Sequence, residues 1–276
     1  MPWQPSRDWK PLTSGTGQAT GGVWLTPDGQ VVKRLVPGVT DHRHHAFWER
    51  QALVAESGVV AGTAGLRAPA CLGVERDEEG ITLRTAYTSP VDWAPETLAA
   101  ALGRFGACSL GEPAWGARDV LRDRLRTAEG RGGWSALSGA GLASVAIEEL
   151  WARRESALAV LDELPRVPTH GDAHPVNLLG RDGADVVAID WEQFGLGPAG
   201  FDLGYLLLAT EVPLDDLLDG QSGSARRGAV LVAAYTGVSR AAWALGQPDP
   251  GDHVERLAKL SAVVDEAVSH ASWKAW

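Results

Sequence analysis

The sequence predicts an α+β fold with two lobes, an antiparallel-sheet N-lobe with one helix over residues 1–87 and a larger, mainly helical C-lobe over residues 88–276. Two observations lead to this prediction. The segment GGVWLTPDGQVVKRLV (21–36) has two apolar, β-branched runs joined by a Thr-Pro-Asp-Gly turn, which is typical of a β-hairpin. Beyond residue 96, long alanine-rich stretches place apolar residues at helical spacing.

The composition is that of a folded, water-soluble chain, with 45% hydrophobic and 22% charged residues. The formal net charge is −10, which argues against a nucleic-acid partner. No apolar run approaches the ~18 residues that a membrane span needs, and the start MPWQPSRDWK lacks the apolar core of a signal peptide. We therefore expect a cytoplasmic monomer or homodimer with no membrane partner.

Within the N-lobe, a Ser/Thr/Gly-rich loop at 12–22 leads into the hairpin. Apolar residues near the 3.6-residue period predict one helix over 41–57, which ends before a glycine. Two further β-like runs follow, separated by a charged turn, at 67–75 and 80–87.

The C-lobe begins with amphipathic segments that predict helices over 97–110 and 119–130. A Gly/Ser-rich loop follows at 130–141, and a long helix is predicted from residue 143 to residue 164, just before a proline. A β-like block at 167–195 interrupts the helices, which resume at residue 202.

The block 167–195 holds the residues that indicate chemistry. Asp172 follows His-Gly, Asn177 lies five residues later, and the apolar run VVAIDW delivers Asp190. Phosphoryl transfer from ATP needs a carboxylate that takes the proton of the acceptor hydroxyl, and a carboxylate with an amide oxygen that hold Mg²⁺. The spacing matches a kinase catalytic loop and metal site, with Asp172 as the base and Asn177 and Asp190 as metal ligands.

A cation must also hold the phosphates from the other lobe. Lys33 lies on the second strand of the predicted hairpin and is the only lysine between residues 11 and 258, in a chain that otherwise uses arginine. Glu49, on the predicted helix, is the candidate partner that keeps Lys33 extended, and Glu56 on the same helix is the alternative. We therefore predict Lys33 and Glu49 as nucleotide-binding residues.

The segments THGDAHPVNLL and VVAIDWEQFGLGPAGFDLG resemble the aminoglycoside phosphotransferase and choline kinase-like family, the small-molecule branch of the protein-kinase fold. The resemblance implies ATP and Mg²⁺ as cofactors, a nucleotide-binding N-lobe, and a C-lobe with the catalytic loop, metal site and acceptor pocket. It implies structural roles for His170 and Asp202, the latter as a helix cap that steadies the catalytic loop. The nucleotide loop lacks a clean G-x-G-x-x-G and is closer to the family's short polar loop. The residues implied for the phosphates are Thr16, Gly17 and Thr20, and those for the adenine hinge are Thr85, Ala86 and Tyr87.

The acceptor is less defined. Between residues 201 and 225 there are five acidic residues and no Lys or Arg, which suits either a pocket for a cationic amino sugar or the start of a helix. Glu192 is placed to help a metal or to touch the acceptor, and DHRHH (41–45) is better explained as a solvated helix start than as a zinc site. Three functions remain: a kinase for a small molecule such as a cationic amino sugar or an aminoglycoside-like antibiotic, a kinase for Ser/Thr of a peptide natural-product precursor, and a non-catalytic nucleotide-binding module.

Overall fold

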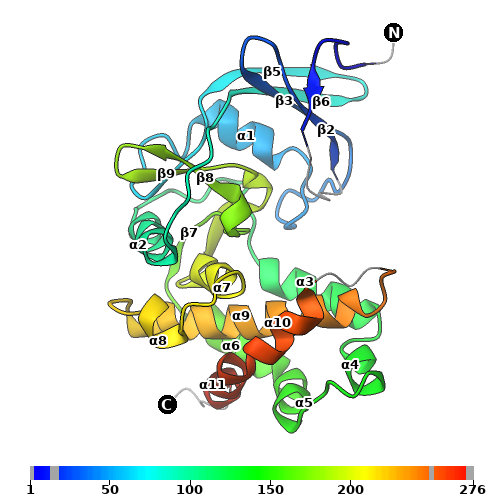
Figure 1. Ribbon diagram of the computed structural model, residues 1–276, viewed down its shortest axis with the longest axis vertical. Coiled ribbons are helices and arrows are strands. Elements are labelled where there is room, and N and C mark those ends of the chain that lie inside the picture. Colours follow the sequence, from blue (N-terminus) through cyan, green and yellow to red (C-terminus); the bar gives the residue numbers. More distant parts are fainter. Residues whose placement is uncertain (1–2, 13–18, 249–251, 272–276) are drawn as a thin grey trace.

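The computed structural model describes residues 3–12, 19–248 and 252–271. Its N-terminal part contains a five-stranded antiparallel sheet with the strand order β1-β2-β3-β6-β5. The helices lie mainly in the C-terminal part (Figure 1), so the predicted α+β class is confirmed. The sheet strands are β1 (Lys10–Pro11), β2 (Thr20–Leu25), β3 (Gln30–Leu35), β5 (Cys71–Asp77) and β6 (Gly80–Ala86).

The predicted hairpin is present as β2 and β3. Residues 26–29 form the turn, in which the Thr26 hydroxyl donates to Asp28 at 2.5 Å and Gly29 takes a φ of +79° that favours glycine. Lys33 lies opposite Val23 on one side and Leu83 on the other. It is therefore held by paired strands on both sides, which fixes where its side chain leaves the sheet.

The single helix of the N-terminal part is shorter than predicted. Helix α1 covers Arg50–Ser57, and residues 41–49 form turns rather than the first half of a helix. Tertiary hydrogen bonds explain why the helix is shorter. The fully buried Arg50 guanidinium donates to backbone carbonyl groups that would otherwise accept hydrogen bonds within a helix. Its five hydrogen bonds, between 2.6 and 2.9 Å, go to the carbonyl oxygens of His42, His44, His45, Trp115 and Glu192.

Two small sheets lie below the large one. Strand β4 (Leu66–Arg67) from the N-terminal part runs parallel to β9 (Asp185–Ala188), which pairs with β8 (Leu178–Asp182). Strands β7 (Arg166–Thr169) and β10 (Gly195–Pro198) form the second pair. Figure 1 shows β8 and β9 between the large sheet and the helices. The short 3₁₀ turns η1 (Pro175–Asn177) and η2 (Trp191–Gln193) sit at the ends of β8 and β9.

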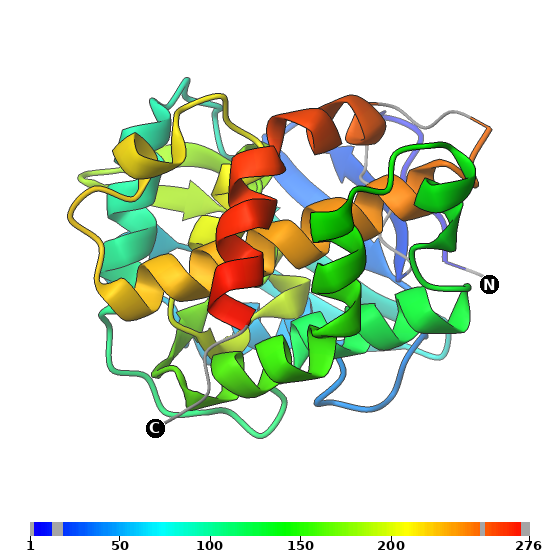
Figure 2. The same cartoon turned by 90° about the horizontal axis from the view of Figure 1, so that it is seen from below.

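The helical part is built around α9 (Gly223–Ala244), whose middle residues are almost all buried. Helix α11 (Ser261–Ala271) lies across α9, as Figure 2 shows from below.

The predicted helix over 143–164 is two helices, because the chain leaves helical geometry at Arg153. The predicted loop at 130–141 contains the short helix α4 (Ser135–Gly139). The remaining helices are α2 (Pro95–Gly106), α3 (Val120–Gly130), α4 (Ser135–Gly139), α5 (Val145–Ala152), α6 (Arg154–Glu163), α7 (Phe201–Leu207), α8 (Leu214–Leu217) and α10 (His253–Lys259).

Across the described ranges, none of these helices is both long enough and apolar enough to cross a membrane. Helix α9 has the length, but it carries arginines near both ends and buries its middle in the helical part.

The buried Arg50 generates a stability prediction. Replacing Arg50 with Gln leaves several inward-facing carbonyl groups without donors, so we expect the free energy of unfolding to fall by about 3 kcal/mol. Urea denaturation followed by circular dichroism measures this change.

Arg76→Gln is the matched control, since Arg76 pairs with Glu56 at 2.6 Å on the surface, where such a pair contributes under about 1 kcal/mol. Equal losses in the two variants would show that the Arg50 bonds do not hold the fold.

Candidate functional site

A cavity of about 520 Å³ lies between the N-terminal sheet and the β8–β9 segment, and we call it the first cavity. Predicted residues from both parts of the chain line it. Lys33 enters from β3, and Asn177 and Asp190 enter from the ends of η1 and β9. Much of the remaining wall is apolar, including Val23, Val31, Leu83, Leu179, Ile189 and Trp191.

Lys33 and Asp190 form an ion pair across the first cavity, with Nζ and Oδ1 2.5 Å apart. Their side chains are 12% and 28% exposed, so water partly screens the pair. Asp190 has a φ of +66°, and within the described ranges it is the one non-glycine residue with a positive φ. Such a conformation costs free energy and is typical of functional positions, where it aims a side chain.

Glu49 is not brought to Lys33. In the residues that the structure describes, the carboxylate within ion-pair distance of Lys33 belongs to Asp190, and Glu49 precedes the first turn of α1. The predicted Lys33–Glu49 pair is therefore not formed in this structure, where Lys33 is paired with Asp190. The α1 side chain that does line the first cavity is Gln51, whose Oε1 atom is buried without a hydrogen-bond partner in the described structure.

Asp172 and Asn177 are joined directly. The Asn177 side-chain amide donates to the Asp172 carbonyl oxygen at 2.9 Å and to its carboxylate Oδ2 at 3.2 Å. These bonds orient the Asp172 carboxylate and leave the Asn177 Oδ1 atom as an acceptor. The five-residue spacing seen in the sequence therefore places the two side chains in contact.

His170 lies behind this loop with none of its surface exposed. Its Nε2 donates to the Ile189 carbonyl at 2.8 Å, and its Nδ1 accepts from the Asp172 N–H at 3.3 Å. The ring packs on Trp191 with centroids 4.6 Å apart. The structural role implied for His170 agrees with these contacts, which tie the loop of Asp172 to the strand of Asp190.

Asp202 holds the same loop from below. Its two carboxylate oxygens accept from the backbone N–H groups of His170 and Gly171, at 2.7 and 2.9 Å. Burial raises the pKa of Asp202, and these hydrogen bonds oppose that effect. Gly171 has a φ of +85°, and a Cβ there would lie 2.3 Å from the Gln193 carbonyl oxygen. The implied steadying role of Asp202 agrees with this geometry, but α7 is preceded by Gly200 and receives no side-chain cap.

The implied hinge residues Thr85, Ala86 and Tyr87 all line the first cavity, as does Thr20. The N–H groups of Ala86 and Tyr87 already donate to the carbonyl oxygens of Ala70 and Gly29. These two backbone donors are therefore already in use within the protein. Thr16 and Gly17 lie outside the described residues.

Glu192 follows Asp190 in the sequence and is half-buried. Burial, reinforced by the negative charge of Asp190, raises the pKa of Glu192 to about 7. Its side chain lines neither of the two main cavities, so the geometry does not choose between the metal and acceptor roles left open by the sequence.

A second cavity of about 330 Å³ lies between α3, α4 and α9, and Asp172 is not one of its lining residues. Arg240 of α9 lines it and places Nη2 3.6 Å from the Asp172 carboxylate. Arg124 of α3 also lines it and donates to the Gln193 side chain at 2.6 Å. Sequence reasoning missed both arginines, because no short spacing connects them to the catalytic loop.

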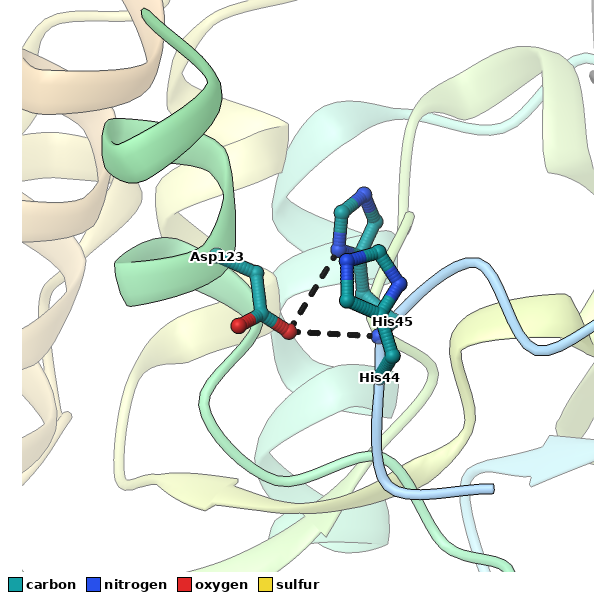
Figure 3. A group of neighbouring side chains, drawn as sticks. All are labelled: His44, His45 and Asp123. Carbon is teal, nitrogen blue, oxygen red and sulfur yellow. Dashed lines mark hydrogen bonds and ion pairs between the residues drawn. The ribbon is translucent and has the colours of Figure 1, made fainter. Parts of the chain in front are cut away.

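The DHRHH segment is not a solvated helix start. His44 and His45 are half-buried in the loop before α1 and lie beside Asp123 of α3 (Figure 3). Their ligand atoms and that of Asp123 lie within 4.8 Å of one another, as in a candidate metal site. Existing bonds account for the cluster, because Asp123 accepts from the His45 N–H and the His44 Nδ1 accepts from the Ala46 N–H. Burial lowers the pKa of His45, which favours a neutral ring.

The acidic residues between 201 and 225 do not line the second cavity. Asp202 lies under the catalytic loop, Glu211 pairs with Lys259, and Asp215 pairs with Arg226 at 2.7 Å. The second cavity therefore has no acidic wall from this segment, and the alternative of a helix start fits α8, whose first turn carries Asp215 and Asp216. The acids instead join neighbouring helices of the C-terminal part.

The chain was compared with known proteins. The model of the phosphotransferase enzyme family matches residues 8–243. A choline/ethanolamine kinase family protein from Mesorhizobium loti superposes with a TM-score of 0.62 at 18% identity, covering 96% of this chain and 91% of that chain. The ADP-bound aminoglycoside phosphotransferase APH(2'')-Ib gives 0.55 at 14% identity, covering 97% and 95%. No curated protein sequence matches. The structural likenesses show the fold, and the family resemblance seen in the sequence is confirmed.

Asp202 supplies a prediction for the loop it holds. In Asp202→Asn, an amide replaces one of two oxygens that accept backbone N–H groups, so one buried donor loses its partner. We expect the free energy of unfolding to fall by about 1–3 kcal/mol in urea denaturation. Asp219→Asn, at an exposed position of the same helical part, should change it by less than about 0.5 kcal/mol. An unchanged stability in Asp202→Asn would remove this role.

Proposed function

Since the chain belongs to the phosphotransferase enzyme family and is thus a kinase with a hydroxyl acceptor, we propose that it moves the γ-phosphoryl group of ATP to a small molecule with the help of Mg²⁺. The observation that carries the proposal is the placement of Asp172. Its carboxylate is bonded to Asn177, which lines the first cavity, and lies 3.6 Å from Arg240, which lines the second. The phosphoryl donor and the hydroxyl acceptor would thus meet at the Asp172 carboxylate.

The first cavity is proposed as the nucleotide site. Its volume of about 520 Å³ and its apolar walls suit a purine base, while Lys33 brings a positive charge toward the phosphates. Bound phosphates would compete with Asp190 for the Lys33 ammonium. Related structures carry ADP or GDP by their own descriptions, and this supports a nucleoside phosphate as the donor.

The Asp190 carboxylate and the free Asn177 Oδ1 are the residues that would hold Mg²⁺. Both are hard oxygen ligands, which this ion prefers, and both face the first cavity beside Lys33. The ion would neutralise charge on the phosphates during transfer.

Asp172 is proposed as the catalytic base. Its carboxylate accepts the proton of the acceptor hydroxyl as the acceptor oxygen bonds to the γ-phosphorus and the bond from phosphorus to the ADP oxygen breaks. Asn177 holds the carboxylate in place for this step. The Asp202 bonds keep the loop from moving away.

The size of the second cavity favours a small acceptor over a peptide. About 330 Å³ between helices holds a compact metabolite, whereas a peptide needs a longer open groove. The chain retains Lys33, Asp172 and Asp190 together, which argues against the non-catalytic nucleotide-binding alternative.

We predict that Asp172→Asn lowers kcat by a factor of about 10²–10⁴. Nucleotide affinity should change little, because the Asp172 side chain is not part of the first cavity's lining. Coupled measurement of ADP release gives kcat, and calorimetry gives the affinity for Mg·ATP. Turnover equal to that of the unchanged protein would show that Asp172 is not the base.

Asp190→Ala should act on binding instead. Loss of a metal-ligating carboxylate should weaken the affinity for Mg·ATP by tenfold or more, with a smaller effect on ATP measured in EDTA. Asp182→Ala is the control, since Asp182 is 64% exposed at the far end of β8. An equal loss with and without Mg²⁺ would contradict the assignment of Asp190 as a metal ligand.

A further inference from the structure

The wall of the second cavity is cationic. Arg124, Arg131 and Arg240 line it, and among its described lining residues there is no aspartate or glutamate. His45, the other titratable group of the wall with a pKa in the physiological range, has that pKa lowered by burial and so adds little charge at neutral pH. A cationic ligand would meet the like charge of three arginines in this space.

Arg124 and Arg240 reach the cavity from different helices and share one platform. Their guanidinium carbons lie 5.0 and 5.1 Å from the centroid of the Tyr205 ring, which is completely buried. The ring limits how each planar guanidinium can turn, and each keeps N–H groups for a ligand. Two guanidinium groups held in this way suit the paired oxygens of a carboxylate or phosphate.

The charges of this pair are only partly balanced by the protein. Arg240 has the Asp172 carboxylate at 3.6 Å, but in the described part of the chain no carboxylate lies within 4.0 Å of the Arg124 guanidinium. Burial lowers the pKa of both arginines, and the negative charge of Asp172 opposes this effect in both. The positive charge of Arg240 lowers the pKa of Arg124 further. Half-buried like charges are costly unless an anion accompanies them.

A neutral group points to a ligand independently. Thr236 of α9 is 4% exposed and lines the second cavity, and its Oγ1 is buried without a hydrogen-bond partner in the described structure. Buried hydroxyl groups are nearly always bonded. A polar ligand in the cavity would supply the missing partner.

We propose that the acceptor is a small hydroxyl compound with an anionic group, a carboxylate or a phosphate, which Arg124 and Arg240 bind while the hydroxyl faces Asp172. This inference rests on the proposed function, because it identifies the second cavity as the acceptor site. It differs from what the names of the related proteins suggest, since choline, ethanolamine and aminoglycosides are cations.

The first test measures anion binding without catalysis. The protein is saturated with Mg²⁺ and a non-hydrolysable ATP analogue, so that the γ-phosphate position is filled, and inorganic phosphate is titrated by calorimetry. We expect Arg124→Gln and Arg240→Gln each to weaken phosphate binding at least tenfold. Arg131 lies at an exposed position of the wall, so Arg131→Gln leaves the core intact. This variant should weaken phosphate binding about threefold.

Arg122→Gln is the matched control. Arg122 lies on α3 two residues before Arg124, but it pairs with Asp162 at 2.8 Å and lies outside the second cavity. It should bind phosphate as the unchanged protein does. Failure of phosphate to bind at millimolar concentration, or equal binding by all four variants, overturns the proposal.

The second test compares acceptors of two related series that are neutral, anionic or cationic. ADP release is measured with glucose, glucuronate, glucose 6-phosphate and glucosamine, and with glycerol, glycerate and serinol. We expect kcat/KM to be at least tenfold higher for the anionic members, and Arg124→Gln to raise the KM for these acceptors while the KM for ATP stays the same. Preference for the amines overturns the inference and leaves the proposed function standing.

Phosphate binding at the arginines without turnover on any acceptor would instead remove the proposed function and support the anion site.

Discussion

The arrangement of the site depends on Arg50, which joins α1 and the loop before it to later parts of the chain. Its guanidinium joins carbonyl groups of the loop before α1 to those of Trp115 and Glu192. The Lys33–Asp190 pair also spans the two parts, but these are the groups that phosphates and metal would engage, so it would open when nucleotide binds. Arg50 faces no nucleotide, and the contact that it makes can persist through turnover. The charged groups of the first cavity can then exchange partners without separating the two parts.

The features that sequence reasoning predicted are those encoded over short distances. The hairpin follows from two β-branched runs and a four-residue turn, and the contact between Asp172 and Asn177 follows from a spacing of five residues. The start of α1 could not be predicted in this way, because residues 41–49 have helical periodicity but give their carbonyl groups to a side chain from the next turn. Tertiary hydrogen bonds overrode local preference there.

The acceptor site could not be located from the sequence, for a different reason. Counting charges along the chain drew attention to the acids between 201 and 225, but a run of charge does not show which side of a helix faces a cavity. In the structure Glu211 and Asp215 are used by Lys259 and Arg226 to join helices. The charge that faces Asp172 comes from single arginines on α3 and α9, which folding alone brings together.

The net charge of −10 and the cationic second cavity are compatible, because they act over different distances. At physiological ionic strength charges are screened over about 8 Å, so most carboxylates of the surface contribute little inside the cavity. Within it, Arg124 and Arg240 lie close to any bound molecule and are partly shielded from water, where each charge has a larger effect. The acidic surface would slow the approach of an anion and favour that of a cation, yet binding is decided at contact. The anionic acceptor that we propose therefore rests on the two guanidinium groups on the Tyr205 ring rather than on the composition of the chain.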